Sequence, residues 1–296
     1  MTKFTSIGVV GRKGHAGTVD TLNRLLRFLA AKSLPVVIDD QTAALVTDDS
    51  ATQYKLSELS KHCDLLIVVG GDGTMLNTVK HVVADEIPVI GVNRGRLGFL
   101  TDILPDELDT ALERVLAGEF DLEKRFLLDV FGPGPDSEAF LGSALNDIVI
   151  HPGPAAQMIE FELFIDDKFV YSLESDGLIV ATPTGSTAYA LSAGGPIMHP
   201  GLHAMVLVPM YPHSLSSRPI AVGGDSEIRL VVAEHTRRNP LISCDGEVKY
   251  TASAGDSFLI RKKPIPLNLI HPSGHSFYQS CRSKLGWGNR LIGEND

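Results

Sequence analysis

The chain has 296 residues and a formal net charge of −10, because 36 aspartates and glutamates outnumber 26 lysines and arginines. This length is sufficient for one large or two medium domains with a proper buried core. The acidic balance disfavours a nucleic-acid-binding surface, which needs lysine and arginine to neutralise phosphates. A polyanionic ligand would therefore have to be held by local donors and a metal ion, not by the overall field of the protein.

No apolar run approaches the roughly 18 residues that a membrane-spanning helix requires. The short apolar segment after Lys3 leads into glycine and basic residues, which favours a first strand over a signal peptide. The three cysteines, Cys63, Cys244 and Cys281, are far apart and lack a Cys-x-x-Cys spacing. This pattern favours a reducing compartment and argues against a disulfide framework or a zinc site. We therefore expect a cytoplasmic protein that binds neither nucleic acid nor membranes.

The first part of the chain alternates apolar strand-like runs with amphipathic segments. Predicted strands cover residues 4–10, 35–39, 64–69 and 88–92, and predicted helices cover residues 18–31, 74–83 and 104–117. Strand–helix–strand repetition at this spacing predicts a parallel sheet with right-handed crossovers. The 64–69 run is unbroken and rich in β-branched residues, as expected for a parallel strand buried on both faces.

Beyond about residue 126 the helical period fades and short strands follow one another. Predicted strands cover residues 126–131, 144–150, 158–165, 169–171, 178–182, 204–209, 227–232, 241–243 and 258–260. Asp166-Asp167-Lys168 and Asp245-Gly246 are typical of hairpin turns, and the segment 132–135 is predicted to be a surface turn. Many short strands separated by glycine and proline predict a β-sandwich-like second domain.

A glycine-rich loop, Gly70-Gly71-Asp72-Gly73-Thr74, joins the 64–69 strand to the 74–83 helix. The glycines permit a sharp turn and leave main-chain N–H groups open to a ligand. Free N–H groups and the helix dipole together make the start of a helix a site for phosphate. The carboxylate of Asp72 among these donors either caps the helix or serves as a base or metal anchor beside the phosphate.

Two further segments follow predicted strands. Asn93 to Phe99 lies after the 88–92 strand, where loops of a doubly wound sheet line the ligand crevice. Arg94 and Arg96 in it could contact phosphate or could simply be solvated. Asn146-Asp147 places a carboxamide beside a carboxylate, which suits ribose or adenine recognition but is also common in turns.

The densest candidate segment runs from Ser175 to Pro196. It combines hydroxyl side chains, glycines and other small residues with one aromatic residue, Tyr189, and it is framed by apolar runs. Small residues allow a flat ring to approach the backbone, while hydroxyls can bond ribose or phosphate. This composition favours a nucleotide pocket over a solvent-exposed linker.

Several common sites are absent from the sequence. There is no Gly-x-x-x-x-Gly-Lys-Ser/Thr loop and no Gly-x-Gly-x-x-Gly fingerprint. His199 and His203 have a metal-like spacing, and so do His271 and His275, but proline and glycine between each pair break the helix that would align them. We therefore expect no metal site built from side chains of the protein.

Several segments, in their order along the chain, match one known family. They are Gly70-Gly71-Asp72-Gly73-Thr74, Asn93 to Phe99, Asn146-Asp147, Ser175-Asp176-Gly177, Thr182 to Ser192, Ser243-Cys244-Asp245-Gly246 and the tail from Asn268 to Trp287. With this set the chain resembles the bacterial ATP-NAD kinases of the proteobacterial type over nearly its whole length. The first motif also occurs in lipid kinases and phosphofructokinases, whereas its combination with Thr182 to Tyr189 is highly specific.

The resemblance implies an α/β plus all-β fold. A Rossmann-like parallel α/β domain over residues 1–125 would be followed by a β-sandwich-like NAD-binding domain over residues 126–270, with the active site between them. The tail from about 271 to 296 would pack back on the first domain. A homodimer or homotetramer would be the working form.

The implied reaction transfers the γ-phosphate of ATP to the 2′-hydroxyl of the adenosine ribose of NAD+. Asp72 would be the general base or orienting group. Nucleotide-binding positions would be Gly73, Asn77, Asn146, Asp147, Gln157, Glu174, Asp176, Thr187, Ala188, Tyr189, Ser192 and Glu247. Phosphoryl transfer relies on positioning and charge neutralisation, so Mg²⁺ is expected to arrive with ATP. An ordinary Asp has a pKa of about 3.9, which makes orientation by Asp72 as important as proton removal.

Four positions depart from the family pattern. Gln157 stands where a basic or imidazole side chain is common, Glu174 where Arg occurs, Glu247 where Gln is frequent, and Asp147 where Glu is more usual. With these changes, the sequence does not decide between NAD and NADH as the substrate, or between ATP and polyphosphate as the phosphate donor. Two alternatives also remain: a diacylglycerol-type lipid kinase, disfavoured by the acidic charge and the lack of a basic amphipathic helix, and a non-enzymatic NAD(P) sensor.

Overall fold

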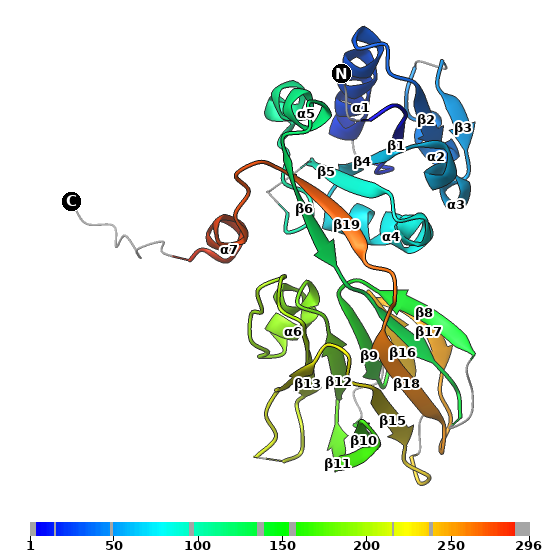
Figure 1. Ribbon diagram of the computed structural model, residues 1–296. Coiled ribbons are helices and arrows are strands. Elements are labelled where there is room, and N and C mark those ends of the chain that lie inside the picture. The colour runs from blue at the N-terminus through cyan, green and yellow to red at the C-terminus, as the bar shows by residue number, and fades with distance from the viewer. Residues whose placement is uncertain are drawn as a thin grey trace, which may run out of the picture. The chain divides into compact units, whose positions relative to one another are not determined.

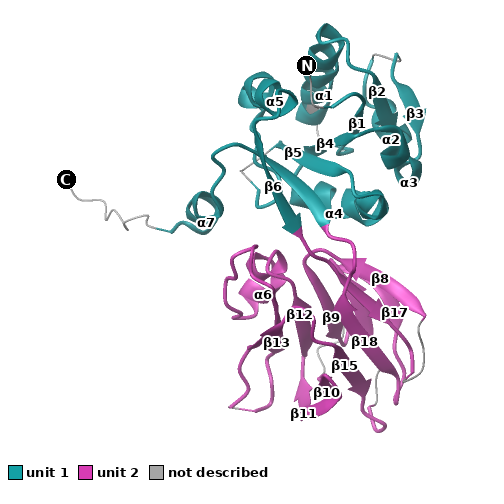
Figure 2. Ribbon diagram, viewed as in Figure 1, with its two compact units in different colours: residues 1–124, 267–296 teal, residues 125–266 magenta. Residues whose placement is uncertain are grey.

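The computed structural model describes residues 4–14, 16–47, 50–94, 98–134, 139–153, 158–214, 216–236 and 239–287. The chain forms two compact units (Figure 2). Unit 1 consists of Met1–Lys124 and Leu267–Asp296, and unit 2 consists of Arg125–Pro266. The chain therefore leaves unit 1, builds unit 2 and returns to unit 1.

Unit 1 is built on a seven-stranded sheet with the order β3-β2-β1-β4-β5-β19-β6 (Figure 1). Its strands are β1 (Ile7–Gly11), β2 (Val36–Asp39), β3 (Thr52–Tyr54), β4 (Leu65–Gly70), β5 (Pro88–Asn93), β6 (Phe120–Arg125) and β19 (Leu267–Pro272). The pairings from β3 through β2, β1, β4 and β5 to β19 are all parallel. The predicted parallel sheet is thus confirmed.

Helices cover both faces of this sheet. The helices of unit 1 are α1 (Ala16–Ala31), α2 (Asp40–Ala43), α3 (Leu56–Leu59), α4 (Asp72–Val82), α5 (Leu108–Leu116) and α7 (Phe277–Leu285), with short 3₁₀ turns at Ser60–His62, Val83–Asp85 and Pro105–Glu107. Alternate residues of β4, such as Leu65 and Ile67, share a core with α1 and α5, while Leu66 and Val68 between them are also fully buried. Burial on both faces explains the unbroken apolar run of β4.

Unit 2 is a sandwich of two six-stranded antiparallel sheets, ordered β11-β10-β15-β18-β7-β8 and β14-β13-β12-β9-β16-β17. The strands are β7 (Leu128–Phe131), β8 (Phe140–Ala144), β9 (Asp147–His151), β10 (Ile159–Ile165), β11 (Lys168–Ser175), β12 (Gly177–Ala181), β13 (Ala204–Met210), β14 (Ile220–Gly223), β15 (Ile228–Val232), β16 (Leu241–Cys244), β17 (Glu247–Thr251) and β18 (Ser257–Lys262). One core contains residues of both sheets, including Phe161 and Phe258 from the first and Ile150 and Leu178 from the second. The predicted sandwich-like region is confirmed.

A separate apolar cluster covers the outer face of the second sheet. Val149, Ile179 and Val206 pack there against Ala190 and Met198. Ala190 belongs to the short helix α6 (Tyr189–Ser192), which follows a 3₁₀ turn at Gly185–Thr187. The small and hydroxyl-rich segment after β12 is therefore packed on the sheet and does not form an exposed linker.

Several predicted boundaries differ from the structure. The strand predicted over residues 144–150 is interrupted, since β8 ends at Ala144 and β9 begins at Asp147. The helix predicted over residues 104–117 begins one residue later, as a 3₁₀ turn at Pro105–Glu107. Leu104 is extended because it precedes a proline. The polar strands β3 and β6 were not predicted, since neither shows an apolar run.

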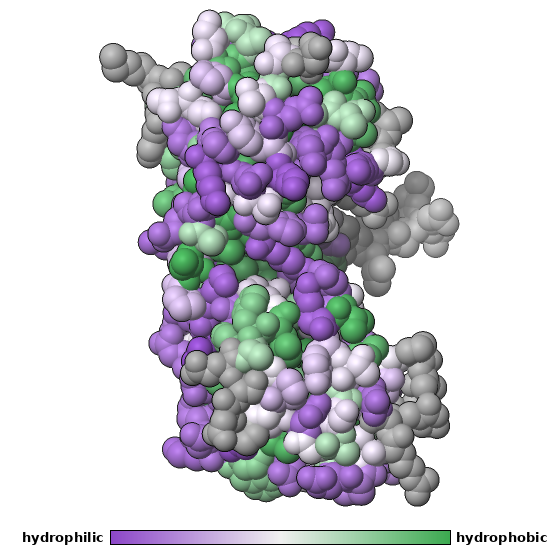
Figure 3. All heavy atoms as spheres, turned by 90° about the vertical axis from the view of Figure 1, so that its right-hand side faces the viewer, coloured by the Kyte–Doolittle hydropathy of each residue, from purple (hydrophilic) through white to green (hydrophobic). Residues whose placement is uncertain are grey.

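The outer surface mixes polar and apolar groups, as the face drawn in Figure 3 shows. Large apolar side chains that are more than half exposed include Phe140, Phe169 and Tyr211. No helix among the described residues combines the length and the apolarity needed to cross a bilayer.

Candidate active site

A cavity of about 840 Å³ lies at the carboxyl edge of the parallel sheet in unit 1. Residues at and after the ends of β1 and β2 line it together with the first turns of α4. Ligands of doubly wound sheets bind at this edge, outside the carboxyl ends of the strands. Gly73 and Asn77, two of the predicted nucleotide-binding residues, are part of the lining.

The cavity carries basic side chains that the sequence argument did not select. Arg12 and Lys13 follow β1, and Lys55 follows β3. Asp39 also lines the cavity; burial raises the pKa of its carboxyl above the ordinary value, although hydrogen bonds from Thr42 act in the opposite direction. The three cations can neutralise a chain of phosphates, and their position at parallel strand ends is the sequence feature that could have identified them.

The first turn of α4 presents open backbone to the cavity. Gly71 is extended and precedes the helix without a side-chain cap, and Asp72 is the first helical residue. A Cβ atom added at Gly71 or Gly73 would meet no atom within 4 Å. The first N–H groups of a helix have no acceptor within the helix and favour an anion, so a phosphate can approach the main chain here.

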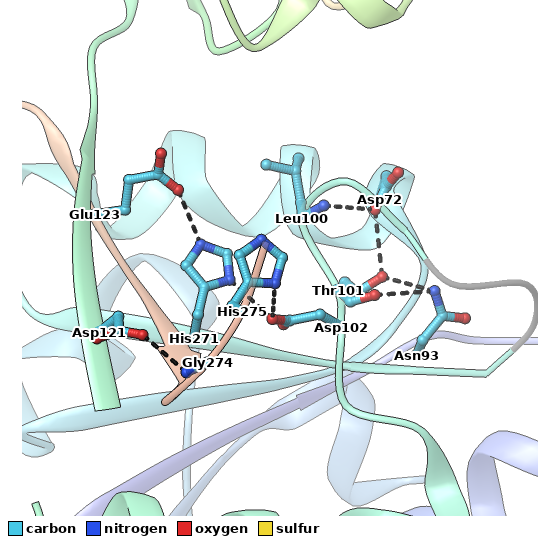
Figure 4. A network of polar contacts seen from close by, with 10 residues as sticks. All are labelled: Asp72, Asn93, Leu100, Thr101, Asp102, Asp121, Glu123, His271, Gly274 and His275. Carbon is cyan, nitrogen blue, oxygen red and sulfur yellow. Dashed lines mark hydrogen bonds and ion pairs between the residues drawn. The ribbon is translucent and has the colours of Figure 1, made fainter. Parts of the chain in front are cut away.

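The carboxylate of Asp72 binds the loop that follows β5 (Figure 4). Its Oδ1 accepts hydrogen bonds from the amide of Leu100 at 3.1 Å and the hydroxyl of Thr101 at 3.2 Å. Its Oδ2 accepts from the amide of Phe99 at 3.0 Å. Since Asp72 holds another loop and does not cap α4, the interpretation of this residue as a helix cap is wrong.

Two further side chains complete the surroundings of this carboxylate. Asn93, the last residue of β5, donates from Nδ2 to the hydroxyl of Thr101 at 2.8 Å. Lys284 of α7 donates from Nζ to Oδ2 of Asp72 at 3.0 Å. Two amides, one hydroxyl and one ammonium group thus fix the orientation of the Asp72 carboxylate at the amino end of α4.

Of the two arginines in the loop after β5, only Arg94 is among the residues that the structure describes. Arg96 lies outside the described residues. The Nε of Arg94 is buried and has no hydrogen-bond partner among the described residues. Arg94 does not line the 840 Å³ cavity, so the predicted contact of these arginines with phosphate stays a prediction.

In unit 2 a single carboxylate shapes the turn between β8 and β9. Asp245, at the tip of the β16–β17 hairpin, accepts hydrogen bonds from the amides of Leu145, Asn146 and Asp147 at 3.0, 2.8 and 3.3 Å. Asp245 and Gly246 both have positive φ, of 48° and 79°, as the predicted two-residue turn requires. The hairpin therefore positions the Asn146-Asp147 pair.

Asp147 is the most perturbed carboxyl of this region. Its residue is 4 % exposed, and burial together with the nearby charge of Asp245 raises its pKa to about 7. A carboxyl that titrates near neutrality can donate a hydrogen bond as well as accept one. This is a suitable group for reading hydroxyls of a ribose.

The segment after β12 closes over the same turn. Thr182 donates from its hydroxyl to the carbonyl of Leu145 at 2.6 Å and from its amide to the carbonyl of Asn146 at 2.9 Å. A Cβ atom at Gly185 would lie 2.0 Å from the carbonyl oxygen of Asn146. Glycine at 185 is therefore required by the close approach of two backbones.

The residues predicted to frame the nucleotide lie just beyond this contact. Thr187 donates to the carbonyl of Thr184 at 3.1 Å, and Ala188 precedes α6. Tyr189 is 51 % exposed, and Ser192 at the end of α6 is also exposed. Within unit 2 these residues share the end of the sheet that carries Asn146, because Ala181 of β12 pairs with Asp147 of β9.

Family models match both parts of the chain. The ATP-NAD kinase N-terminal domain matches residues 7–120, and the ATP-NAD kinase C-terminal domain matches residues 145–272. The chain belongs to the ATP-NAD kinase family. The predicted resemblance is confirmed.

Individual members of the family agree with this assignment. The NAD kinase of Teredinibacter turnerae is 52% identical over 289 residues, which are 98% of this chain and 99% of that protein. An NAD kinase from Archaeoglobus fulgidus, solved in complex with ATP, superposes with a TM-score of 0.71 at 25% identity over 95% of this chain and 97% of that chain. Yeast NADH kinase complexed with NADH shares the fold, with a TM-score of 0.88 at 24% identity over 98% of this chain and 90% of that chain.

Not every residue assigned from the NAD kinase resemblance joins the Asn146 turn. Glu174 lies near the end of β11 and Asp176 directly precedes β12, whereas the predicted binding segment follows the end of β12. Glu174 is exposed and its carboxylate lies 4.0 Å from Nδ1 of His213. Glu247 is exposed and pairs with Lys249 at 2.7 Å. Gln157 lies outside the described residues.

Thr101 and Lys284 were not among the residues predicted for the site, although both side chains bind Asp72. Thr101 and Lys284 are 29 and 212 residues away from Asp72 along the chain. Thr101 lies just beyond the Asn93 to Phe99 segment and Lys284 lies in the tail that matches the family, but only the three-dimensional structure brings them to the carboxylate. The order of parallel strands could have indicated the Thr101 loop, since it follows β5, the neighbour of β4.

Proposed function

We propose that this chain transfers the γ-phosphate of ATP to the 2′-hydroxyl of the adenosine ribose of NAD+ and so forms NADP+. The observation that carries this proposal is the 52% identity to an NAD kinase over 98% of the chain. The archaeal relative that binds ATP supports the choice of phosphate donor. The anchored carboxylate of Asp72 beside an anion-binding helix start supplies the chemistry.

In this proposal Asp72 orients the 2′-hydroxyl and accepts its proton as phosphoryl transfer proceeds. The amides of Phe99 and Leu100, the hydroxyl of Thr101 and the ammonium group of Lys284 keep its carboxylate in one orientation. Such positioning is where most of the rate enhancement of phosphoryl transfer arises.

The 840 Å³ cavity would hold the phosphates. The amide of Gly73 and the first turn of α4 offer donors, and Arg12, Lys13 and Lys55 offer positive charge. Asn77 lines the same cavity one turn further along α4. Mg²⁺ enters as part of the ATP substrate, where it neutralises phosphate charge.

Unit 2 would recognise the dinucleotide. Asn146 and Asp147 offer donors and acceptors to ribose hydroxyls, and the Asp245 carboxylate holds their backbone in place. Thr187, Ala188, Tyr189 and Ser192 would frame the adenine, with the half-exposed ring of Tyr189 as the stacking surface.

We also propose that the working form is a homodimer or homotetramer in the cytoplasm. Asp176 and Thr182 flank the five-residue strand β12 and are six residues apart, so at ~3.3 Å per residue they are separated by roughly 20 Å. Glu174 and Asp176 would then serve a nucleotide bound by a second copy. The three cysteines are free and buried, as expected of a protein kept in a reducing compartment.

Oligomeric state is tested by light scattering on the eluting protein. Mixing Asp72→Asn protein with Asp176→Asn protein would restore activity if each site takes residues from two copies. A monomer, or a mixture that stays inactive, would contradict this part of the proposal.

The kinase activity is tested with purified protein, NAD+, ATP and Mg²⁺, with NADP+ read by an NADP-specific dehydrogenase. Asp72→Asn should lower kcat by at least ~100-fold, as loss of a general base does. NAD+ affinity, measured by calorimetry, should change by less than about threefold. Asp20→Asn on the exposed face of α1 is the matched control and should retain full activity.

Other results would favour the alternatives. NAD+ binding without ATP consumption in the wild type indicates an NAD(P) sensor. Phosphorylation of diacylglycerol in vesicles, with no NAD+ binding, indicates a lipid kinase.

A further inference from the structure

Unit 1 contains a second cluster of polar side chains, away from the phosphate cavity. Nδ1 of His271 and Nδ1 of His275 lie 2.9 and 3.0 Å from the same oxygen, Oδ2 of Asp102 (Figure 4). The two imidazole rings stack with their centroids 4.0 Å apart and their planes 12° apart. One carboxylate oxygen therefore lies against both imidazoles.

The turn after β19 brings the two histidines together without a helix. His271 is in β19, and the chain reverses at Gly274, whose φ is 92°. The amide of His275 donates to the carbonyl of Pro272 at 3.2 Å, and the amide of Gly274 donates to Asp121 at 3.2 Å. The expectation that only a helix could align His271 and His275 was wrong, because this turn stacks their rings.

The cluster has the composition and compactness of a metal site. Asp102, His271 and His275 each offer one ligand atom, and these atoms all lie within 4.8 Å of one another. Two imidazoles and one carboxylate form a common ligand set for zinc and for other divalent first-row ions, with further positions open to water.

A buried oxygen of Asp102 without a hydrogen-bond partner among the described residues also supports a metal ion at this cluster. The side chain of Asp102 is 9 % exposed, and its Oδ1 is buried with no hydrogen-bond partner among the described residues. A buried carboxylate oxygen without a partner is costly unless a cation or a donor reaches it. A metal ion bound at this carboxylate would satisfy it.

A second carboxylate, that of Glu123, contacts the ring nitrogen of His271 that faces away from Asp102. Oε2 of Glu123 lies 3.1 Å from Nε2 of His271, the ring nitrogen opposite the one that faces Asp102. Metal-binding histidines generally donate their other N–H to a carboxylate or carbonyl, which fixes the tautomer and strengthens the ligand. Glu123 and Asp102 also place two negative charges beside the imidazoles, which a divalent ion would balance.

A route for an ion is present. A cavity of about 520 Å³ is lined by Asp102 and His275, with Ser276 and Gln279 of the following segment. His275 is the more exposed of the two histidines, at 16 % against 2 % for His271. A hydrated ion can therefore approach from the side of His275.

From these observations we infer that Asp102, His271 and His275 bind a divalent transition-metal ion of the zinc class, with Glu123 orienting His271. The ion is separate from the Mg²⁺ that accompanies ATP, and its binding does not depend on the proposed reaction. Asp102 directly follows Thr101, and His275 precedes the helix that carries Lys284. The ion would therefore join the two segments that hold Asp72.

The test uses untagged, full-length protein dialysed against a chelator and then titrated with Zn²⁺ by calorimetry. The wild type should bind one equivalent, and Co²⁺ should give the visible absorption of a site with nitrogen ligands. His275→Asn and Asp102→Asn should reduce Zn²⁺ binding to background, and Glu123→Gln should weaken it by about 10–100-fold. Zn²⁺ should also raise the Tm of the wild type but not that of His275→Asn.

The control is His203→Asn, which removes an exposed histidine paired with Asp225 in unit 2. It should bind Zn²⁺ as the wild type does. Circular dichroism of each metal-free variant shows that loss of binding does not reflect misfolding, and the partly exposed His275 is the position best able to tolerate substitution. No stoichiometric binding by the wild type, or equal binding by wild type and His275→Asn, would overturn the inference.

Discussion

Nζ of Lys284 lies 3.0 Å from Oδ2 of Asp72, although 212 residues separate the two along the chain. The pair brings α7, which follows the whole of unit 2 in sequence, to the first residue of α4. The proposed catalytic carboxylate is therefore completed by a segment from the far end of the described chain.

Replacing Lys284 by methionine should affect turnover more than stability. Both side chains are about a quarter exposed, at 29% and 26%, so the ion pair contributes at most ~1 kcal/mol to folding. A misoriented Asp72 should lower kcat by about 10- to 100-fold. Steady-state kinetics with NAD+ and ATP checks this, with Arg282→Met on the same helix as the control. An unchanged kcat would show that Lys284 does not position Asp72.

The Thr101 hydroxyl can be tested by a change that preserves shape. Thr101→Val removes the link between Asn93 and Asp72 within a fully buried position. We expect a loss of about 1–2 kcal/mol in the free energy of unfolding and a lower kcat. Thr101→Ser restores the hydroxyl and should recover kcat. Equal kinetics for the valine and serine variants would contradict the link; urea unfolding and initial rates supply both measurements.

Asp147 should make stability depend on pH near neutrality. Its pKa of about 7 in the folded protein lies above the ordinary value of 3.8, so the folded state binds the proton more tightly than the unfolded state. Stability is therefore greatest below about pH 4 for this group and falls as the pH rises toward 7. Asp147→Asn cannot ionise, so it should gain stability relative to the wild type over this range.

The measurement is urea unfolding of both proteins from pH 5 to pH 8. Asp176→Asn, at the other end of β12, controls for the loss of a carboxylate in unit 2. Parallel curves for wild type and Asp147→Asn would contradict the raised pKa.

Gly73→Ala should separate stability from nucleotide binding. A Cβ atom at Gly73 would meet nothing within 4 Å, and alanine favours a helix over glycine by up to ~1 kcal/mol. The variant should therefore be equally or more stable, while its methyl group obstructs phosphate and raises KM for ATP several-fold. Differential scanning calorimetry and ATP titrations check the two effects. A KM equal to that of the wild type would place the phosphates elsewhere.

Local patterns were sufficient where burial or turn chemistry dominates. The unbroken apolar run of β4 predicted a strand covered on both faces, and Asp245-Gly246 predicted the hairpin between β16 and β17. The Asp72 motif indicated a site at the start of α4. In each case neighbouring residues carry the physical cause of the structure.

Patterns failed where the cause lies far away in the chain. β6 has the sequence FDLEKR and shows no apolar run, because it lies at the edge of the sheet beside β19. The turn between β8 and β9 depends on Asp245, about 100 residues later. The partners of Asp72 and the stacking of His271 on His275 depend on α7 and on a turn, which spacing rules based on a helix do not describe.

The return of β19 to the sheet of unit 1 affects how a nascent chain can mature. While residues up to Lys124 leave the ribosome, the start of β5 at Pro88 and Val89 lacks its β19 neighbour, which is synthesised only after unit 2. The early product thus displays an open strand edge, which is prone to pairing with other chains. It also lacks Lys284, so a protein interrupted during synthesis would retain the nucleotide-binding loop but lack the ammonium group that completes the surroundings of Asp72.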